Sequence, residues 1–311
     1  MAVLLRCGRM YRLSTFRTSN EMKHSIKDVK LDVSPEFRMM HNRIGIFNTN
    51  FQNFGHCNIP KAQLILADPP YGIGNNAYAS NPAWYVGGDN KNGESDLAGE
   101  EFFDTDKDFR PAEFMHFCSQ MLRPEPKEKG KAPCMVIFCG WEQQFYYKEL
   151  GQRYGFKGCI PLVFRKNYSA QVLKANMKVV GNCEYGLILY RDKLPKFNNN
   201  GEMIMNCMEF PRELGMPRTH PTQKPIQLLK RIISIFTDPD DVVIDPTAGS
   251  CSSIVAAASM NRKAYGFEIK KQIYSQGVEN CKRFISHDLF EISPQMEKRR
   301  EYTEQKLFTE F

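Results

Sequence analysis

Short apolar runs alternate with amphipathic segments along most of the chain. The runs are bounded by polar or turn-forming residues, as is typical of strands buried in a parallel sheet. They predict strands over residues 44–51, 64–68, 134–139, 159–165, 184–190, 242–245 and 264–268. Segments with apolar residues on one face predict helices over residues 111–122, 142–153 and 253–261, and a further helix that the segment 220–225 opens. Strands that alternate with helices favour an α/β fold on a doubly wound, mostly parallel sheet.

Four stretches depart from this pattern. Residues 75–109 hold eight acidic residues and two lysines, a net charge of −6, which predicts a long flexible insertion. Residues 1–21 carry four arginines and one acidic residue, which predicts a disordered basic extension before Met22 or, alternatively, an organellar transit peptide. A loop of roughly 25 residues is expected after residue 192, and residues 291–311 predict a charged tail. The folded domain is therefore expected over residues 22–290.

Composition excludes some classes of protein. The chain has 311 residues, of which 42% are hydrophobic and 25% charged, and a net charge of +7, which is ordinary for a soluble globular enzyme. No apolar run approaches the roughly 20 residues that span a bilayer, so we expect no membrane-embedded segment. Ten cysteines occur without a C-x-x-C pair or a secretory signal, so we expect free thiols, no metal site and a reducing, cytoplasmic location.

The sharpest local feature is Asp68-Pro69-Pro70-Tyr71, at the carboxyl end of a predicted strand. Ligands of open α/β sheets lie at this edge. The two prolines fix the backbone and remove two donors, which leaves carbonyl groups as acceptors. A planar ring with an NH2 group suits this set, because Asp68 and the Pro69 carbonyl can accept the amine hydrogens while Tyr71 stacks on the ring. The alternative is a turn that ends the strand, with Asp68 as its cap.

Two further segments have the composition of ligand-binding turns. Residues 245–252 place small residues between a strand and a helix, whose N-terminal N–H groups can bind a carboxylate. Glu268 ends the next strand, in the position of the carboxylate that binds ribose hydroxyls in nucleoside-binding folds. In the segment 219–225, Thr222 and Gln223 can cap a helix while Lys224 can meet a ligand carboxylate. A plain helix start is the alternative.

In this order the three motifs resemble those of the β-class amino-methyltransferases, which methylate exocyclic amines of DNA bases. The resemblance covers roughly residues 44–285 and implies S-adenosylmethionine as methyl donor, a Rossmann-like sheet of about seven strands, and a flipped base as acceptor. The catalytic motif that it implies comprises Asp68, Pro69, Pro70 and Tyr71. The cofactor pocket that it implies comprises Asp245, Pro246, Thr247, Gly249, Ser250 and Glu268, with Thr222, Gln223 and Lys224 beside them.

Two departures from the pattern of this family concern the cofactor. Cys251 stands where the Gly loop usually has a second glycine, so a thiol must fit where a hydrogen atom is usual. Asn48 and Asn50 stand where such enzymes often carry an acid. Either can contact the adenine of the cofactor, and Asn50 is the one that we assign to the cofactor pocket.

The acceptor that the resemblance favours is the exocyclic N6 amine of adenine in double-stranded DNA. The motif begins with Asp, whereas enzymes that methylate cytosine N4 more often begin with Ser. Cytosine N4 remains the alternative acceptor. A second alternative is a DNA-binding relative with weak turnover, for which Cys251 is the only support.

DNA contacts are expected from residues 160–218, the candidate target-recognition region. Its first part, residues 160–196, carries seven basic and two acidic residues. The candidates for contacts with the DNA backbone are Arg165, Lys166, Lys174, Lys178 and Arg191. A solvated basic rim is the alternative, and the insertion 75–109 can share in recognition. A homodimer and a cognate restriction enzyme are further partners that the resemblance allows, in a bacterial or phage setting.

Overall fold

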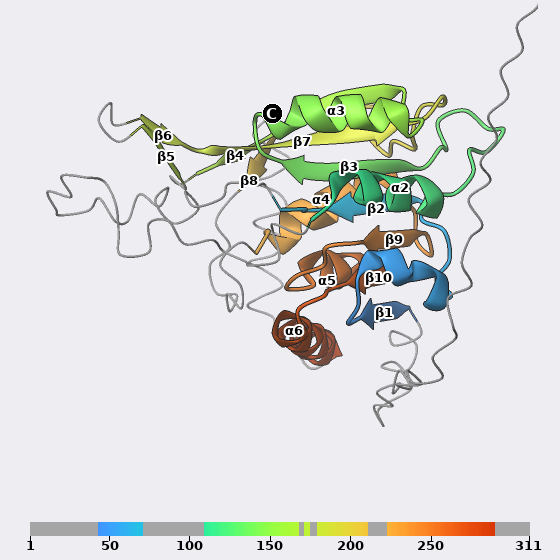
Figure 1. Cartoon of the computed structure of the whole chain (residues 1–311), viewed down its shortest axis with the longest axis vertical. Helices are drawn as coiled ribbons and strands as arrows, with labels where there is room; N and C mark the ends of the chain where they lie inside the picture. Colours follow the sequence, from blue (N-terminus) through green and yellow to red (C-terminus); the bar gives the residue numbers. More distant parts are fainter. Residues whose placement is uncertain (1–42, 71–108, 168–170, 175–178, 211–222, 290–311) are drawn as a thin grey trace, which may run out of the picture. The chain divides into compact units, whose positions relative to one another are not determined.

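An eight-stranded sheet forms the centre of the structure, with its strands in the order β1-β10-β9-β2-β3-β7-β4-β8 (Figure 1). This computed structural model describes residues 43–70, 109–167, 171–174, 179–210 and 223–289. The strands of the sheet are β1 (Ile44–Phe47), β2 (Leu64–Ala67), β3 (Cys134–Cys139), β4 (Gly158–Lys166), β7 (Cys183–Tyr190), β8 (Cys207–Phe210), β9 (Val242–Asp245) and β10 (Lys263–Phe267). All of them pair in parallel except β7, which is antiparallel to both neighbours. The predicted doubly wound, mostly parallel α/β sheet is confirmed.

The sheet has one strand more than the sequence predicts. Strand β8 lies in the segment expected to be a loop, where it pairs with the end of β4. Strands β5 (Gln171–Lys174) and β6 (Val179–Gly181) form a separate two-stranded sheet that was also not predicted. The first predicted strand was too long: it ends at Phe47, and the 3-10 helix η1 (Phe51–His56) follows.

Helices cover both faces of the sheet, and the side chains of β2 explain why this strand is apolar throughout. Leu64 and Leu66 pack in one core cluster with helices α4 (Ile226–Phe236) and α5 (Ser252–Ser259). Ile65 and Ala67 point to the opposite face and pack with helices α2 (Pro111–Met121) and α3 (Gln143–Arg153). A strand buried on both faces carries no polar alternation. Helix α6 (Lys271–Leu289) follows β10.

The candidate target-recognition region is largely part of this same sheet. Strands β4, β7 and β8 all lie within residues 160–218 or overlap their start, and the hairpin β5–β6 lies between β4 and β7 in the sequence. Residues 1–21, residues 75–108 of the acidic insertion and residues 291–311 lie outside the described residues. Among the helices that the structure describes, none is long and apolar enough to cross a bilayer.

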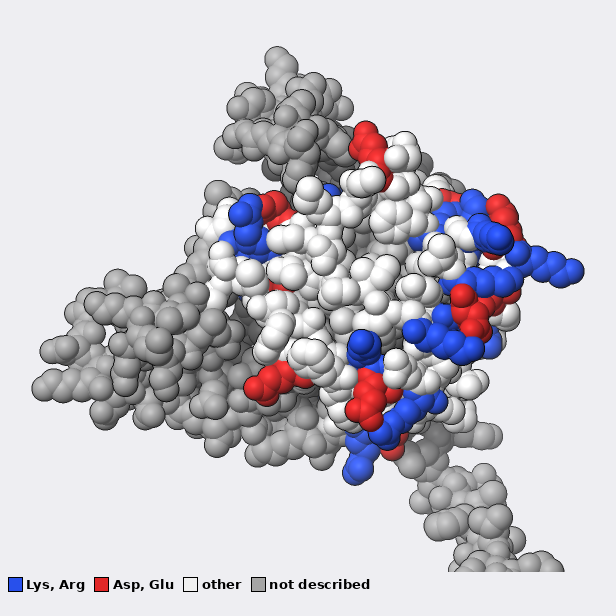
Figure 2. Space-filling view, turned by 90° about the horizontal axis from the view of Figure 1, so that it is seen from above, with Lys and Arg blue, Asp and Glu red and all other residues white. Residues whose placement is uncertain are grey.

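Basic and acidic side chains are interspersed on the described surface. Figure 2 shows Lys and Arg in small groups beside Asp and Glu, around a broad uncharged area. Surface pairs such as Arg153–Glu149, at 2.5 Å, and Lys157–Asp192, at 2.6 Å, account for part of this pattern. Exposed pairs of this kind contribute little to stability, about 0–1 kcal/mol each.

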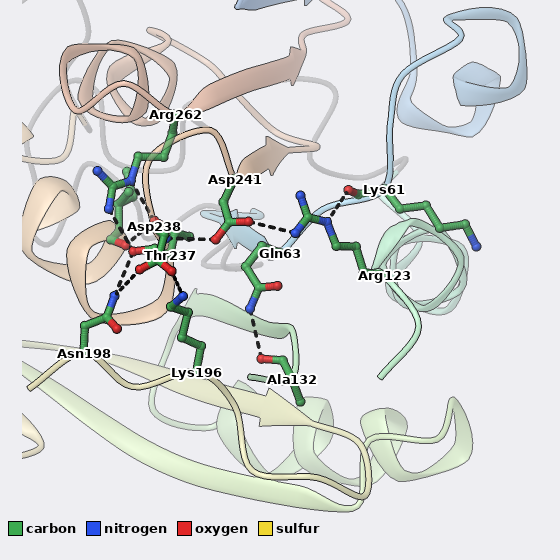
Figure 3. A network of polar contacts seen from close by, with 11 residues as sticks. Lys61, Gln63, Arg123, Ala132, Lys196, Asn198, Thr237, Asp238, Asp241 and Arg262 are labelled. Carbon is green, nitrogen blue, oxygen red and sulfur yellow. Dashed lines mark hydrogen bonds and ion pairs between the residues drawn. The ribbon is translucent and has the colours of Figure 1, made fainter. Parts of the chain in front are cut away.

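A polar network ties the chain together at the amino ends of β2 and β9 (Figure 3). The Arg262 guanidinium is buried and donates to both the hydroxyl and the carbonyl oxygen of Thr237, at 3.0 and 2.8 Å. Arg123 pairs with Asp241 at 2.7 Å and donates to the Lys61 carbonyl at 3.3 Å. These bonds satisfy backbone carbonyls at the turns that lead into the strands. The network therefore has a structural role at the edge opposite the predicted motifs.

Candidate functional site

Three carboxylates that the sequence singled out emerge at one edge of the sheet. Strands β2 and β9 are parallel neighbours, with Ile65 opposite Ile244. Asp68 follows β2 and Asp245 is the last residue of β9, so both lie at the carboxyl ends of adjacent strands. Glu268 directly follows β10, which is the next neighbour of β9. This is the edge at which open α/β sheets bind ligands.

The two oxygens of the Asp68 carboxylate have different surroundings. The Lys224 ammonium lies 2.8 Å from Oδ2. Oδ1 is buried and has no hydrogen-bond partner among the residues that the structure describes. A buried acceptor without a donor costs about 1–3 kcal/mol, so such an atom in a folded protein calls for an explanation. Tyr71, the last residue of the motif, lies outside the described residues.

A glutamine that sequence reasoning missed fixes the proline segment. Gln143, at the start of α3, donates from Nε2 to the Pro70 carbonyl at 3.3 Å. Its Oε1 accepts from the Gly140 N–H at 3.0 Å. The turn after β3 therefore holds the backbone that follows Asp68 and Pro69. Only the position of Gln143 near the end of the neighbouring strand could have indicated this contact.

Lys224 contacts the protein's own carboxylates, whereas the sequence suggested a ligand carboxylate. Its ammonium lies between Asp68 and Glu184, 3.1 Å from Glu184 Oε2, and 5.0 Å from the centre of the Phe138 ring. Lys166 forms an ion pair with the other oxygen of Glu184. Glu184, at the start of β7, was not singled out from the sequence. These contacts join the predicted catalytic motif to the segment before α4.

The charges in this network sustain one another. Burial alone would lower the pKa of Lys224, but Asp68 and Glu184 raise it above its ordinary value. Burial alone would likewise raise the pKa of Glu184, yet Lys224 and Lys166 lower it below its ordinary value. Both side chains therefore stay charged at neutral pH.

The predicted Gly loop follows β9 and is organised by the two other carboxylates. Asp245 accepts from the Thr247 N–H at 2.9 Å and from the Ser253 hydroxyl. Glu268 accepts from the Gly249 N–H at 3.1 Å. Gly249 has a φ of +50°, and a Cβ there would meet no atom closer than 3.9 Å. The backbone conformation therefore favours glycine, and the space beside it is open.

Both carboxylates prefer a proton more than an exposed acid does. Burial raises the pKa of Asp245 to about 7, although the hydrogen bonds from Ser253 and Thr247 oppose the shift. Burial also raises the pKa of Glu268, against hydrogen bonds from Lys270 and Gly249. A cation or hydroxyl donors placed beside these groups would stabilise their ionised forms. Helix α5 after the loop has no side-chain cap, which leaves its first N–H groups to solvent or to a ligand.

Cys251 fits at the glycine position because helix α6 makes room for it. It has a φ of +62° and its side chain is fully buried. A Cβ on Gly277 of α6 would lie only 2.5 Å from the Cys251 Sγ. The thiol thus occupies space that a glycine on the neighbouring helix leaves open. The departure from the glycine pattern is accommodated behind the loop, on its α6 side.

The other residues predicted for the cofactor pocket have the following positions. Pro246 and Ser250 are buried within the loop, and the Ser250 hydroxyl lies 2.9 Å from that of Ser252. Asn50 caps η1, where its Oδ1 accepts from the Gln52 N–H at 3.0 Å. Gln223 is partly buried before α4, and Thr222 lies outside the described residues. The N-cap residue of helix α4 is Pro225, which provides no side-chain cap, and capping by Thr222 or Gln223 stays a prediction.

The residues predicted to contact DNA fall into different environments. Arg165 is exposed at the carboxyl edge, where it pairs with Glu209. Lys166 forms an ion pair with Glu184, and 10% of its side chain is exposed. Its contact with the DNA backbone stays a prediction. Arg191 follows β7, whose antiparallel direction takes it to the opposite edge. There the Arg191 guanidinium donates to the carbonyls of Ser119 and Arg123, at 2.7 and 2.8 Å. Lys174 lies in β5, and Lys178 lies outside the described residues.

Comparison with known proteins identifies the family of the chain. A family model for N6 and N4 enzymes, described as DNA methylase, matches residues 62–279. The chain belongs to this family of DNA methylases. The residues of this methylase that the family model matches include Asp68, the ion network, the Gly loop and Glu268. It leaves Asn50 outside.

Relatives and solved structures agree with this assignment. YubD of Escherichia coli (strain K12), which is named as a methylase, is 30% identical over 218 residues, 69% of this chain and 79% of YubD. The DNA adenine methyltransferase YhdJ of the same organism is 27% identical over 258 residues, 76% of this chain and 81% of YhdJ. The crystal structure of the M1.HpyAVI–SAM complex superposes with a TM-score of 0.53 at 21% identity, over 76% of this chain and 99% of that one. The methylase therefore shares the fold of that protein.

Proposed function

We propose that this methylase transfers a methyl group from S-adenosylmethionine to the exocyclic N6 amine of an adenine flipped out of double-stranded DNA. The observation that carries this proposal is the buried Asp68 Oδ1, which has no donor among the described residues. An NH2 group on a planar base is a donor of the right kind for a carboxylate oxygen. The positions of Pro69 and Pro70 directly after Asp68 support the same assignment.

Asp68 is proposed to activate the amine. The lone pair of an exocyclic amine is delocalised into the base, so the nitrogen is a weak nucleophile. A hydrogen bond from the amine to Asp68 Oδ1, and a second to the Pro69 carbonyl, would localise the lone pair and fix its direction. When the nitrogen forms its bond to the methyl carbon it must lose one proton, and the Asp68 carboxylate can accept that proton. Positioning of the amine supplies much of the rate.

The loop after β9 and the end of β10 are proposed to hold the methyl donor. S-adenosylmethionine, when bound, supplies an electrophilic methyl group on a cationic sulfur. Two carboxylates with raised pKa values support the fit, the buried Asp245 and the partly buried Glu268. A nearby cation would stabilise the ionised form of Asp245, and ribose hydroxyls would stabilise that of Glu268. The open space beside Gly249 and the uncapped start of α5 suit the approach of a ligand to the backbone. The remaining residues that we assign to this pocket are Pro246, Thr247, Ser250 and Gln223.

Extrusion of the target base has a cost that the protein must offset. Flipping a base out of a duplex costs a few kcal/mol. Stacking on an aromatic side chain is worth about 1–3 kcal/mol per base, and Tyr71 is the residue that we assign to this contact. Arg165, exposed at the same edge of the sheet as Asp68, is our candidate for a phosphate contact.

Adenine is proposed over cytosine on two grounds. The motif begins with Asp68, as is more frequent among adenine enzymes, and YhdJ is named as a DNA adenine methyltransferase. The family model covers enzymes of both kinds. Because the same pocket chemistry serves any base with an NH2 group, only the product distinguishes the two acceptors.

A radiolabelled methyl-transfer assay on double-stranded DNA, followed by digestion to nucleosides, tests the proposal. We expect label in N6-methyldeoxyadenosine; label in N4-methyldeoxycytidine would replace adenine by cytosine, and no label would refute the enzymatic function. Asp68→Ala should lose methylation but still bind S-adenosylmethionine in a calorimetric titration. The matched control is Asp192→Ala, which removes an exposed carboxylate paired with Lys157. Normal turnover by Asp68→Ala would refute the role of this residue.

A further inference from the structure

We propose that Glu184 and Lys224 are positioning residues, which hold one oxygen of Asp68 so that the other faces the amine of the target base. This inference rests on the proposed function. It concerns two side chains that act through Asp68, and neither is proposed to touch the base or the cofactor.

Four charged side chains from four separate elements meet in this network. Asp68 follows β2, Lys166 ends β4, Glu184 begins β7, and Lys224 precedes α4. Cations and anions alternate in the order Lys166, Glu184, Lys224, Asp68. Among the described residues, two positive and two negative charges cancel in this network. Removal of one member leaves an uncompensated charge in a buried position.

Stability alone does not explain this network. Removal of charges from water is unfavourable, and well-packed apolar side chains in place of a buried ion network are often as stable or more stable. One Asp68 oxygen also has no donor among the described residues, and a buried acceptor without a donor adds a further cost. Because this ion network lowers stability at the candidate catalytic residue, we infer that its role is to fix the orientation of the Asp68 carboxylate. Buried polar groups that fix a unique arrangement are the best-attested use of such networks.

The geometry assigns a definite task to each member. A carboxylate can rotate about its last bond and exchange its two oxygens. The contact of 2.8 Å from Lys224 to Oδ2 opposes that rotation and leaves Oδ1 as the acceptor. Lys224 is itself held from other sides, by Glu184 at 3.1 Å and by the Phe138 ring. Glu184 is anchored by Lys166.

Glu184 reaches this position because β7 is antiparallel. The register pairs Arg165, at the carboxyl end of β4, with Cys183 at the start of β7. The first residues of β7 therefore lie at the same sheet edge as Asp68, whereas its last residues lie at the opposite edge. The antiparallel insertion thus brings a carboxylate from the start of a strand to the ends of the parallel strands.

The test compares Glu184→Gln and Lys224→Met with the wild-type enzyme in steady-state methylation at saturating DNA and S-adenosylmethionine. A misplacement of about 1 Å can lower a rate about 100-fold, so we expect kcat to fall about 10-fold in Glu184→Gln and about 100-fold in Lys224→Met. The dissociation constant of S-adenosylmethionine should stay within about 2-fold of the wild-type value. The double variant should be no slower than Lys224→Met, because Glu184 acts through Lys224. Matched controls are Glu149→Gln and Lys157→Met, which alter exposed ion pairs.

The split between kcat and cofactor affinity separates positioning from a general loss of structure. A loss of structure would lower the affinity for S-adenosylmethionine together with kcat. A misplaced Asp68 carboxylate lowers kcat alone, because neither Glu184 nor Lys224 is proposed to touch the cofactor.

Several outcomes would overturn the inference. A wild-type kcat in Glu184→Gln would do so. A tenfold loss of S-adenosylmethionine affinity in Lys224→Met with kcat unchanged would also do so, because it would make Lys224 a cofactor ligand. If either variant fails to fold, Glu184→Asp decides, because it keeps the charge and withdraws the carboxylate by one methylene. An unchanged kcat in Glu184→Asp would also refute the positioning role. If the wild-type protein methylates no DNA, the proposed function fails instead. If only Asp68→Ala is inactive, the proposed function stands and the positioning role fails.

Discussion

The contact between Cys251 and Gly277 predicts a strong energetic coupling between the Gly loop and helix α6. A Cβ on Gly277 would lie 2.5 Å from Cys251 Sγ, 3.4 Å from Cys251 Cβ and 3.0 Å from the Gly249 carbonyl oxygen. The first distance is about 1 Å shorter than an ordinary van der Waals contact, since atoms attract best at about 3.5–4.0 Å. Gly277→Ala must therefore displace either the thiol or the helix.

The magnitude follows from two opposing effects. Alanine in place of glycine in a helix interior stabilises by about 1 kcal/mol. Overpacking of a well-packed core costs about 1–3 kcal/mol, so Gly277→Ala should lower the free energy of unfolding by up to about 2 kcal/mol. In a Cys251→Gly background the thiol contact is absent, although the contact with the Gly249 carbonyl remains. The same Gly277→Ala change should then cost about 1–2 kcal/mol less.

Urea unfolding of the wild type, both single variants and the double variant measures this coupling in a double-mutant cycle. Gly151→Ala in α3 is the matched control, because a Cβ there meets its nearest atom, Leu189 Cδ1, at 3.4 Å. We expect the control to be close to neutral or stabilising. If the effects of Cys251→Gly and Gly277→Ala add within about 0.5 kcal/mol, the thiol does not occupy the space that Gly277 leaves, and the reasoning is refuted.

Three further predictions concern other parts of the protein. The pKa of Asp245 is raised from 3.8 to about 7, so between these pH values the folded state binds more protons than the unfolded state. The free energy of unfolding should therefore fall by up to about 4 kcal/mol as the pH rises through this window. In urea unfolding, the stability of Asp245→Asn should depend less on pH than that of the wild type. Arg262→Met removes the Arg262 donor to the buried Thr237 hydroxyl and one of the two donors to the Thr237 carbonyl, which keeps its bond from Asn198, so the free energy of unfolding should fall by about 1–3 kcal/mol while the kcat of the folded enzyme is unchanged. Arg165→Ala should reduce the slope of log Kobs for DNA binding against log salt concentration by about 1, and Arg191→Ala should leave this slope unchanged. Equal slopes for the wild type and both variants would show that Arg165 does not contact the DNA.

The strands of the core could be predicted from the sequence because their signals are local. Strands β2 and β3 are apolar throughout, and the structure buries every residue of both. Strand β8 lacks such a signal, since Cys207 is exposed and Glu209 is partly buried. Its pairing with the end of β4 depends on residues that lie more than forty positions earlier in the chain. A four-residue strand that pairs with a distant segment shows no periodic pattern of hydrophobic residues in the sequence.

The site was predictable in its motifs and unpredictable in its contacts. Asp68, Asp245 and Glu268 follow apolar strands, and parallel strands end at one edge, so their shared location follows from the sequence. The contacts of Lys224 do not, because they depend on the direction of β7. The basic composition of residues 160–196 also does not show that Arg165 and Arg191 lie at opposite edges of the sheet. Their separation follows from the antiparallel pairing of β4 with β7.

The two edges of the sheet use charge in different ways, and the difference supports the location of the site. At the amino edge, the Arg262 and Arg191 guanidinium groups donate to backbone carbonyls, and these bonds hold turns in place. At the carboxyl edge, Lys224 satisfies one oxygen of Asp68 while the other has no donor in the described chain. An unsatisfied buried acceptor destabilises the folded state by about 1–3 kcal/mol. An amine that donates to this oxygen would offset that cost on binding. The same oxygen that lowers the stability of the free protein is thus the one that can select a base with an NH2 group.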